Sequence, residues 1–500
     1  MRKFWVILLS VGLIMALAAP ALAVDVKFSG SYVVQGYYED NRQLAEIPGS
    51  TLAGSQGGPS LSLTWQRLRV GTVFQVAEGL SLTTRFDAME KVWGASRMPI
   101  PGSTYQATAD SNGYQITGSG EAENIKFQLV YATFNTGIGR FLVGYQTQSA
   151  WGTSFGDSSD YAYGPRVRWD MTVGPSFFGL VWDKYEGLNA SYPGIGYTSP
   201  AQVDDSKDKY SAFYVYNWDK GNAGIQVQYL LDTSNSGATK PIGQDNGYKK
   251  NVYFFDPYVK ATMGPVYFEA EAIYVMGKLR IWETGNSGRS DVDISGLSAY
   301  AMAKVDLKPA YVGGAFVYIS GDDAGKTDTV TAGVPGGADF NPCLILGNYD
   351  LSRWAGYMGN MNLAAVNTAL TWASATNPLG GINGVGLENI WAYQVFVGAT
   401  PIPKLDTKLA VTYAYFDKTP SDNGTSAKYN QTMRDNSDGN WVSKDLGWEA
   451  DLTATYKIYD NLSWMVGFGY LWAGDAWKGT NPNANVKNDY LLTHKLTLTF

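Results

Sequence analysis

The chain has 500 residues, and its 38 lysines and arginines against 45 aspartates and glutamates give a net charge of −7 at pH 7. This acidic balance excludes the basic surface that nucleic-acid binding requires. One cysteine and one histidine exclude an internal disulfide framework and a Cys or His metal cluster, and they argue against Ser–His catalysis. We therefore predict a protein that is not an enzyme and has no cofactor, resident metal or nucleic-acid partner.

Residues 1–23 have the features of a secretory signal peptide. Arg2 and Lys3 precede an apolar run, and a small-residue site ends at Ala23, so we expect cleavage after Ala23; the alternative is an uncleaved anchor. Loss of these two positive charges leaves residues 24–500 with a net charge of −9. No later apolar run reaches the roughly 18 residues that a spanning helix needs. The sequence thus predicts an exported domain, residues 24–500, that is not a helical membrane protein.

The first two clear strands are predicted at residues 67–76 and 80–91. Their apolar faces consist of Leu68, Val70, Thr72, Phe74 and Val76, and of Leu80, Leu82, Thr84, Phe86 and Ala88. Their polar faces consist of Arg67, Arg69, Gly71, Val73 and Gln75, and of Ser81, Thr83, Arg85, Asp87 and Lys91. Successive side chains of a strand point to opposite sides. The pattern fits either a soluble sandwich with its apolar face inward or a membrane barrel with that face toward lipid.

The lengths of the connections favour the barrel. Eight short breaks occur at 77–79, 137–139, 174–175, 219–224, 264–265, 306–309, 400–404 and 458–461. Nine long polar stretches alternate with them, at 39–60, 94–123, 150–163, 186–208, 233–250, 281–292, 321–388, 418–444 and 474–486. Short turns at one rim and long loops at the other are typical of bacterial outer-membrane barrels. The predicted fold class is therefore all-β, a transmembrane antiparallel β-barrel of about 18 strands with short periplasmic turns and long extracellular loops.

The segment 488–500, "NDYLLTHKLTLTF", is expected to close the barrel. An open sheet edge would leave unpaired backbone groups in hydrocarbon, so we predict that this segment pairs with residues 24–38. Its lipid face is expected to contain Tyr490, Leu492, Leu496, Leu498 and Phe500. His494 falls at an apolar-face position, where we interpret it as a boundary residue. The alternating pattern that ends in Phe500 resembles the assembly signature of outer-membrane barrels.

Charged residues at polar-face positions are the candidate pore lining. One arc is mainly basic and contains Arg67, Arg69, Arg85, Lys126, Arg140, Arg166 and Arg168, with Asp87 and Asp170. The opposite arc contains Glu269, Glu271, Glu449 and Asp451. Arginine binds carboxylate and phosphate well, so the basic arc predicts a moderate preference for anions. The alternative is that pairs such as Arg85 with Asp87, or Arg168 with Asp170, are structural.

The stretch 321–388 is longer than an ordinary loop, and loops of this length usually have a function or are disordered. We predict that it folds into or over the pore and constricts it; a surface cap or an adhesive patch is the alternative. Cys343 within it is expected to be a packed apolar residue and not a reactive thiol. We interpret the acidic segments 320–328 and 435–440 as loop turns, since they lack the ligand spacing of a calcium loop.

Three segments carry a family resemblance: residues 63–94, the "YISGDD" at 318–323, and residues 446–477. They resemble the alginate-export-type porins, and more closely the outer-membrane porins of that type in deltaproteobacteria. The resemblance implies a monomeric 18-stranded porin, and it implies no substrate because the loops match no pattern of the family.

The function predicted from the sequence is that of a porin for passive diffusion of small hydrophilic solutes, moderately favouring anions. We expect it in the cell outer membrane, in contact with lipid and lipopolysaccharide, as a monomer, with a trimer as the alternative. One alternative function is a substrate-specific channel for acidic sugars. Another is a barrel scaffold, either an adhesin or a sheath for an electron-transfer partner.

Overall fold

The structure is a computed structural model. It describes residues 24–41, 44–46, 60–94, 125–187, 206–233, 248–282, 290–323, 326, 328–351, 387–419, 441–479 and 481–500. The signal peptide predicted at 1–23 and the acidic segment 435–440 lie outside these residues. Among the described residues, no helix has the length and apolar character to cross a membrane.

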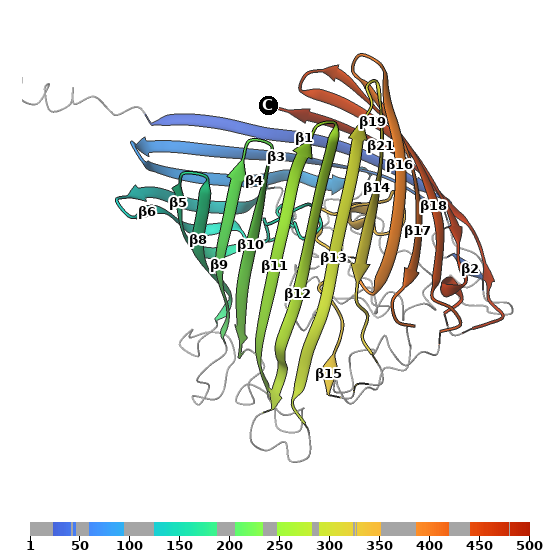
Figure 1. The fold of residues 1–500 in the computed structure, drawn as a ribbon. Coiled ribbons are helices and arrows are strands. Elements are labelled where there is room, and N and C mark those ends of the chain that lie inside the picture. Colours follow the sequence, from blue (N-terminus) through green and yellow to red (C-terminus); the bar gives the residue numbers. More distant parts are fainter. Residues whose placement is uncertain are drawn as a thin grey trace, which may run out of the picture.

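The described chain forms a closed antiparallel β-barrel (Figure 1). Its first nine long strands are β1 (Asp25–Glu39), β3 (Leu61–Ala77), β4 (Leu80–Val92), β5 (Ile125–Thr136), β6 (Gly139–Thr147), β7 (Tyr163–Val173), β8 (Ser176–Gly187), β9 (Ser206–Trp218) and β10 (Gly221–Asp232). The other nine are β11 (Tyr248–Met263), β12 (Val266–Trp282), β13 (Val292–Asp306), β14 (Ala310–Ile319), β16 (Ile390–Ile402), β17 (Leu405–Phe416), β18 (Asp445–Tyr459), β19 (Leu462–Ala473) and β21 (Asp489–Thr499). The predicted fold class of about 18 barrel strands is thereby confirmed.

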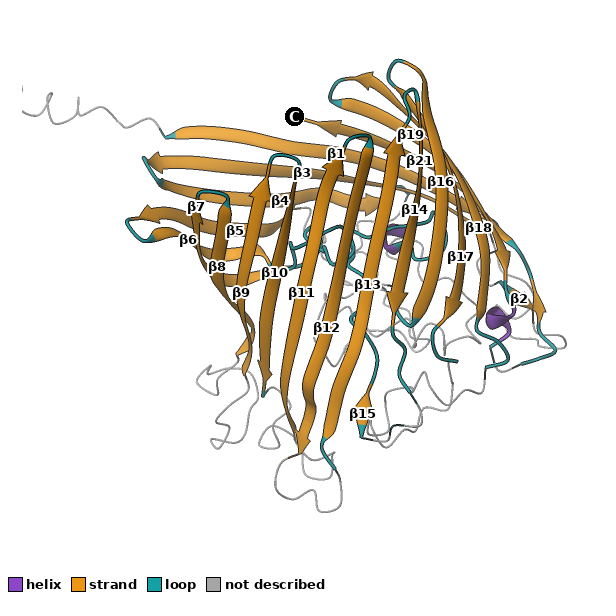
Figure 2. Ribbon diagram, in the orientation of Figure 1, coloured by secondary structure: helices purple, strands orange, loops and turns teal. Residues whose placement is uncertain are grey.

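Three short strands and a 3₁₀ helix supplement the barrel, and a second short helical segment lies at residues 349–351 (Figure 2). β15 (Thr329–Val330) pairs in parallel with β13. β2 (Ala45–Glu46) and β20 (Asn485–Val486) pair with each other, and the 3₁₀ helix η3 (Asp475–Lys478) follows β19.

The barrel closes where the first and last strands meet, as the terminal alternation predicted. β1 pairs with β3 on one side and with β21 on the other, so neither edge is left open. The seam ends with Gly30 N donating to Phe500 O at 2.8 Å and Phe500 N donating to Gly30 O at 3.1 Å. Residue 30 has to be small, because a Cβ there would lie 2.6 Å from Cζ of Phe500. The Phe500 ring therefore covers Gly30 on the lipid-facing side of the seam.

Short and long connections alternate around the barrel, and their positions agree closely with the predicted ones. The largest difference among the short turns lies between β9 and β10. The sequence predicted a break at 219–224, whereas β10 already begins at Gly221, which pairs with Trp218. Residues 221–224 thus belong to the strand and not to the turn.

The exterior of the barrel suits a bilayer. Along β18 the outward side chains include Trp448, Leu452 and Tyr456, which are 52%, 53% and 43% exposed. Eight residues separate the two aromatic ones, which corresponds to about 27 Å along a strand and about 20 Å along the axis of a barrel with tilted strands. This distance is close to the height of about 25 Å that is usual for the apolar band of a membrane barrel.

Aromatic rings gather on the outer surface near the two rims. Toward the long loops, neighbouring strands bring Tyr318 within 4.3 Å of Trp391, and Tyr413 within 4.8 Å of Trp448, measured between ring centroids. Toward the short turns, Tyr216 and Trp218 at the end of β9 lie 6.4 Å apart and are 46% and 41% exposed. Side chains with an apolar body and a polar tip are favoured at the two water–lipid boundaries.

One predicted orientation is wrong because β4 contains an irregularity. Met89 has a positive φ of 54°, and the β3–β4 register shifts between Gln66 and Leu68. The extra residue changes the phase of the alternation. As a result Glu90 faces the interior, where it lies 3.7 Å from Arg67, and Lys91 pairs with outward-facing Gln66.

Candidate functional site

The basic arc on β3 and β4 is paired with carboxylates inside the barrel. Arg69 donates to both carboxylate oxygens of Asp87, at 2.7 and 2.9 Å, and to Asp160 of the loop 148–162. Arg67 lies 3.9 Å from the same Asp160. The pairing of Arg85 with Asp87, weighed as an alternative from the sequence, is not among the salt bridges of the described residues; Arg85 Nε donates to Gln128 Oε1 at 2.9 Å. Through Asp160, this arc connects the barrel wall to the loop 148–162.

The arginines on β6 and β7 are paired in the same way. Arg140 forms a bidentate pair with Asp170 at 2.8 and 3.0 Å, and Arg168 donates to the same carboxylate at 2.8 Å. Arg166 forms a bidentate pair with Asp183 at 2.6 and 2.9 Å. The structural pairing of Arg168 with Asp170, weighed as an alternative from the sequence, is thus present.

Lys126 differs from these arginines. It lies opposite Asp87 in the β4–β5 register, and its Nζ is 5.5 Å from the centre of the Tyr163 ring. Lys126 is the second residue of β5, at the end of this strand that follows the long loop.

Glu269 and Glu271 on β12 also have specific partners. Tyr267 and Tyr300 both donate their hydroxyl hydrogens to Glu269, at 2.7 and 2.9 Å. Glu271 accepts from the backbone N and the Oγ1 of Thr153, at 2.5 and 2.6 Å. Glu271 therefore holds the loop 148–162 from the side of the barrel opposite Arg69.

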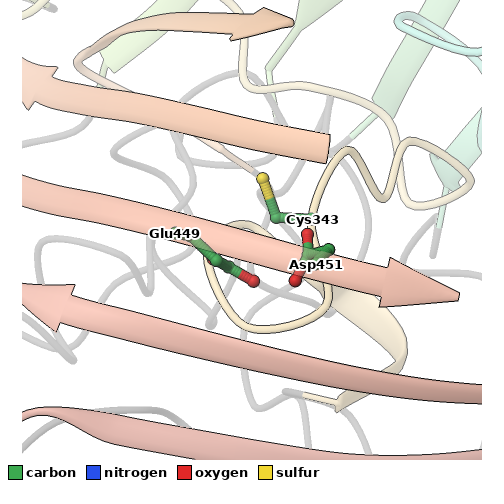
Figure 3. Close-up of side chains that lie close together, drawn as sticks. All are labelled: Cys343, Glu449 and Asp451. Carbon is green, nitrogen blue, oxygen red and sulfur yellow. The ribbon is translucent and has the colours of Figure 1, made fainter. Parts of the chain in front are cut away.

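Glu449 and Asp451 on β18 hold a second inner segment, residues 331–351 (Figure 3). Glu449 accepts from the backbone N of Ile345 and of Leu346, both at 2.7 Å. Asp451 accepts from the backbone N of Leu344 at 3.2 Å. Three successive N–H groups thus point at two carboxylates, an arrangement in which the backbone binds negative charge.

Cys343 lies beside these two carboxylates and is buried. Its Sγ is 3.3 Å from Oγ1 of Thr412 on β17, and Gln394 Nε2 on β16 donates to the carbonyl of Pro342 at 2.9 Å. The thiol is 5% exposed, and burial raises its pKa well above the usual value. A thiol of this kind is unreactive, in agreement with the expectation that Cys343 is a packing residue.

The loop 148–162 and the segment 331–351 meet inside the barrel. Gly337 N donates to Phe155 O at 2.7 Å, and Asp339 N donates to Asp157 O at 3.1 Å. The ring of Phe155 stacks on Tyr300 at 5.6 Å and meets Phe340 edge-on at 5.4 Å. We call these two segments the inner loops. The loop 148–162 extends from Arg69 on β3 to Glu271 on β12, on the opposite side of the barrel, and so across the lumen.

A pH effect is expected where the inner loops meet. Burial, with the nearby charges of Asp160 and Asp157, raises the pKa of Asp339 to about 6. A carboxyl whose pKa is raised on docking favours the docked state in its protonated form, so contact between the loops strengthens as the pH falls from 7 through 6 toward 4. We expect the conductance to fall over that window.

The Asp339→Asn variant tests this effect. Asparagine keeps an acceptor for Ser159 Oγ and Asp160 N, which donate to Asp339 at 3.2 and 3.1 Å, but it does not titrate. Single-channel conductance measured from pH 7 to pH 4 is expected to change less in the variant than in the wild type. Identical pH profiles would contradict the assignment to Asp339.

The inner loops leave a cavity of about 700 Å³ along one side of the lumen. Its wall comes from strands β7 to β12, and its inner side from the inner loops. The lining contains the cations Arg166, Arg168, Lys209 and Lys260, the amides Gln148, Asn217, Asn222, Gln226 and Gln228, and the carboxyls Asp157, Asp256 and Glu388. A volume in the range of about 300–1,000 Å³ is typical of sites for small molecules.

Several of these residues were not predicted from the sequence. Asp183 and Asp160 are the carboxylates that pair with Arg166 and Arg69, and Lys209 and Lys260 lie on strands outside the predicted basic arc. Alternation on β9 and β11 places both lysines on the polar face, so their orientation was available as a signal. No local sequence signal predicted that the loop 148–162 folds inward, because its contact between Thr153 and Glu271 joins residues 118 positions apart.

Comparisons with known proteins assign this chain to no family. No protein-family model matches the sequence, and no curated protein matches it. Among solved structures, the outer membrane channel DcaP of Acinetobacter baumannii is similar at 14% identity, over 96% of this chain and 98% of that one, with a TM-score of 0.38. OccK9 (OpdG) of Pseudomonas aeruginosa is similar at 12% identity, over 95% and 99% of the two chains, with a TM-score of 0.45. Similarity at this level assigns no function.

Proposed function

We propose that the protein is an outer-membrane channel for passive diffusion of small hydrophilic solutes. The observation that supports this most is the combination of a lipid-compatible exterior with a polar interior that retains a cavity of about 700 Å³ beside the inner loops. An 18-stranded barrel is wide enough for an aqueous channel unless loops fill it, and here the inner loops fill part of it. We further propose that lipid and lipopolysaccharide surround it and that it is a monomer.

The channel is tested by recording the refolded protein, without residues 1–23, in a planar bilayer under a salt gradient. Steady single-channel currents are the expected result. Silence from a barrel that migrates as folded on a gel would contradict the channel and favour the scaffold or adhesin. The alternative of a channel for acidic sugars requires a continuous basic track, which Asp87, Asp170 and Asp183 interrupt.

Selectivity is expected to be weak. The anion preference was predicted from the arginines, but Arg69, Arg140 and Arg166 each form a bidentate pair with a carboxylate. Paired charges produce only a small net field in the lumen. We therefore propose a small anion preference.

The triple variant Arg67→Gln, Arg69→Gln and Arg168→Gln measures that preference. The Arg67 and Arg69 substitutions leave Glu90, Asp87 and Asp160 without these cations, and the Arg168 substitution removes a third positive charge, so we expect the reversal potential under a salt gradient to shift toward cation selectivity. Lys91→Gln, on the outward face, is the matched control and should leave the reversal potential unchanged. An unchanged potential in the triple variant would mean that these arginines lie outside the ion path.

A further inference from the structure

The cavity beside the inner loops has an aromatic strip on its wall, which we define as Trp151, Phe177, Phe213 and Tyr258. The ring centroids of Phe177 and Phe213 are 5.2 Å apart, and Trp151 lies 5.8 Å from Phe213 and 5.2 Å from Tyr258. Trp151 belongs to the loop 148–162 and is fixed by a hydrogen bond from its Nε1 to the carbonyl of Asp256 at 2.9 Å. The strip is therefore continuous, and Trp151 is held in place within it.

A row of amides runs beside this strip on β10. Asn222, Gln226 and Gln228 face the cavity at alternate positions. They span six residues, or about 20 Å of strand. Gly224 interrupts the row, and a Cβ at this position would lie 2.7 Å from the ring of Tyr258. The missing side chain thus brings the amide row and the aromatic strip into contact.

Two acceptor atoms of the cavity lining receive no hydrogen bond from any residue that the structure describes. They are Asn222 Oδ1 and Glu388 Oε1. Glu388 is 7% exposed, so it is more than nine-tenths buried. Buried acceptors require donors, which water supplies in an empty channel. A solute rich in hydroxyl groups can replace that water without loss of hydrogen bonds.

The cations of the cavity lining are already engaged. The guanidinium of Arg168 pairs with Asp170 and lies 5.6 and 5.1 Å from the ring centres of Phe177 and Phe213. Lys209 is 3.8 Å from Asp183, and Lys260 donates to Gly152 O at 2.7 Å. A carboxylate solute would bring more acceptors to a site that lacks donors for those it has. A cationic solute would meet four positive side chains.

We propose that this cavity is a binding site for neutral saccharides in transit through the channel. The apolar face of a sugar ring stacks on the aromatic strip, while its hydroxyl groups donate to Asn222 Oδ1 and Glu388 Oε1 and exchange hydrogen bonds with the amide row. The volume admits a mono- or disaccharide with water. This inference rests on the proposed channel function and specifies its solute class.

The test is inhibition of the ion current by sugar. Glucose, maltose and maltotriose are added in a concentration series to single channels of the refolded protein in a planar bilayer. Dextran too large to enter the pore, at matched viscosity, corrects for the slower movement of ions. We expect a saturable fall in current beyond the dextran effect.

Two variants on β8 and one on β10 locate the site. Phe177→Ala removes an inward ring of the strip, and we expect it to raise the half-blocking concentration of sugar by roughly three- to tenfold. Phe178→Ala is the matched control, since this neighbour faces outward and packs on Trp169 at a centroid distance of 5.9 Å. Asn222→Ala removes an acceptor without altering the strip and should also weaken block. Heat-modifiability on gels verifies that each variant is folded.

The outcomes separate this inference from the proposed function. Absence of any conductance overturns both. Normal conductance without block by sugar overturns the saccharide site and leaves the channel. Stronger block by benzoate than by sugar assigns the cavity to aromatic anions, and stronger block by lysine assigns it to cations; either result overturns the proposal. Equal weakening by Phe177→Ala and Phe178→Ala contradicts the placement of the site.

Discussion

The double variant Glu449→Ala and Asp451→Ala is expected to raise the single-channel conductance severalfold. These carboxylates accept three backbone hydrogen bonds from residues 344–346, at 2.7 to 3.2 Å. A hydrogen bond to a charged group contributes about 1.5–3 kcal/mol, and a buried donor left without an acceptor costs about 1–3 kcal/mol. Removing both acceptors therefore destabilises the docked position of the segment 331–351 by several kcal/mol. The segment should leave the wall and widen the lumen.

Cys343 provides an independent measurement of the same release. In the wild type its thiol is buried, so a charged thiol reagent should modify it only after denaturation. In the double variant the same reagent should react with the folded barrel. Asp460→Ala, in the exposed turn after the same strand, removes an acidic group without touching the segment and should change neither readout. If conductance and reactivity both stay at the wild-type level, the carboxylates do not hold the segment in place.

The barrel was predictable from the sequence because its signals are local. Period-two alternation sets the faces of each strand, and turn residues set its ends. The predicted loop 321–388 is flanked in the structure by β14 ending at Ile319 and β16 beginning at Ile390. Errors arose where one extra residue changes the phase. Met89 is such a place, because the shift there turns Glu90 toward the lumen and Lys91 away from it.

The interior was less predictable because its contacts are distant in the sequence. The positions of Glu271, Glu449 and Asp451 on the polar faces followed from alternation, but their partners did not. Each of these carboxylates accepts backbone N–H groups from an inner loop more than 100 residues away. Nothing in the local pattern distinguishes a wall carboxylate that lines water from one that binds a loop. For this reason the sequence suggested an acidic arc of the pore where the structure has anchors for the inner loops.

The orientation of β18 leads to the second large effect, on the stability of the barrel itself. Leu452 lies midway between Trp448 and Tyr456 on the outer face and is 53% exposed. A lysine on the lipid face at the bilayer midplane costs roughly 2–4 kcal/mol. Leu452→Lys should therefore lower the free energy of unfolding by about that amount, measured by urea titration of the barrel refolded in lipid vesicles.

Thr453→Lys, one residue further along, is the matched control for Leu452→Lys. Thr453 faces the lumen, pairs with Gly467 on β19 and is partly exposed, so a lysine there should change the free energy of unfolding by less than about 1 kcal/mol. A one-residue slip in register exchanges the two faces of a strand. The reverse order of the two costs would therefore mean that β18 is inverted, with Glu449 and Asp451 toward lipid. Because those carboxylates hold the segment 331–351, that result would also remove the physical basis for placing the segment inside the barrel.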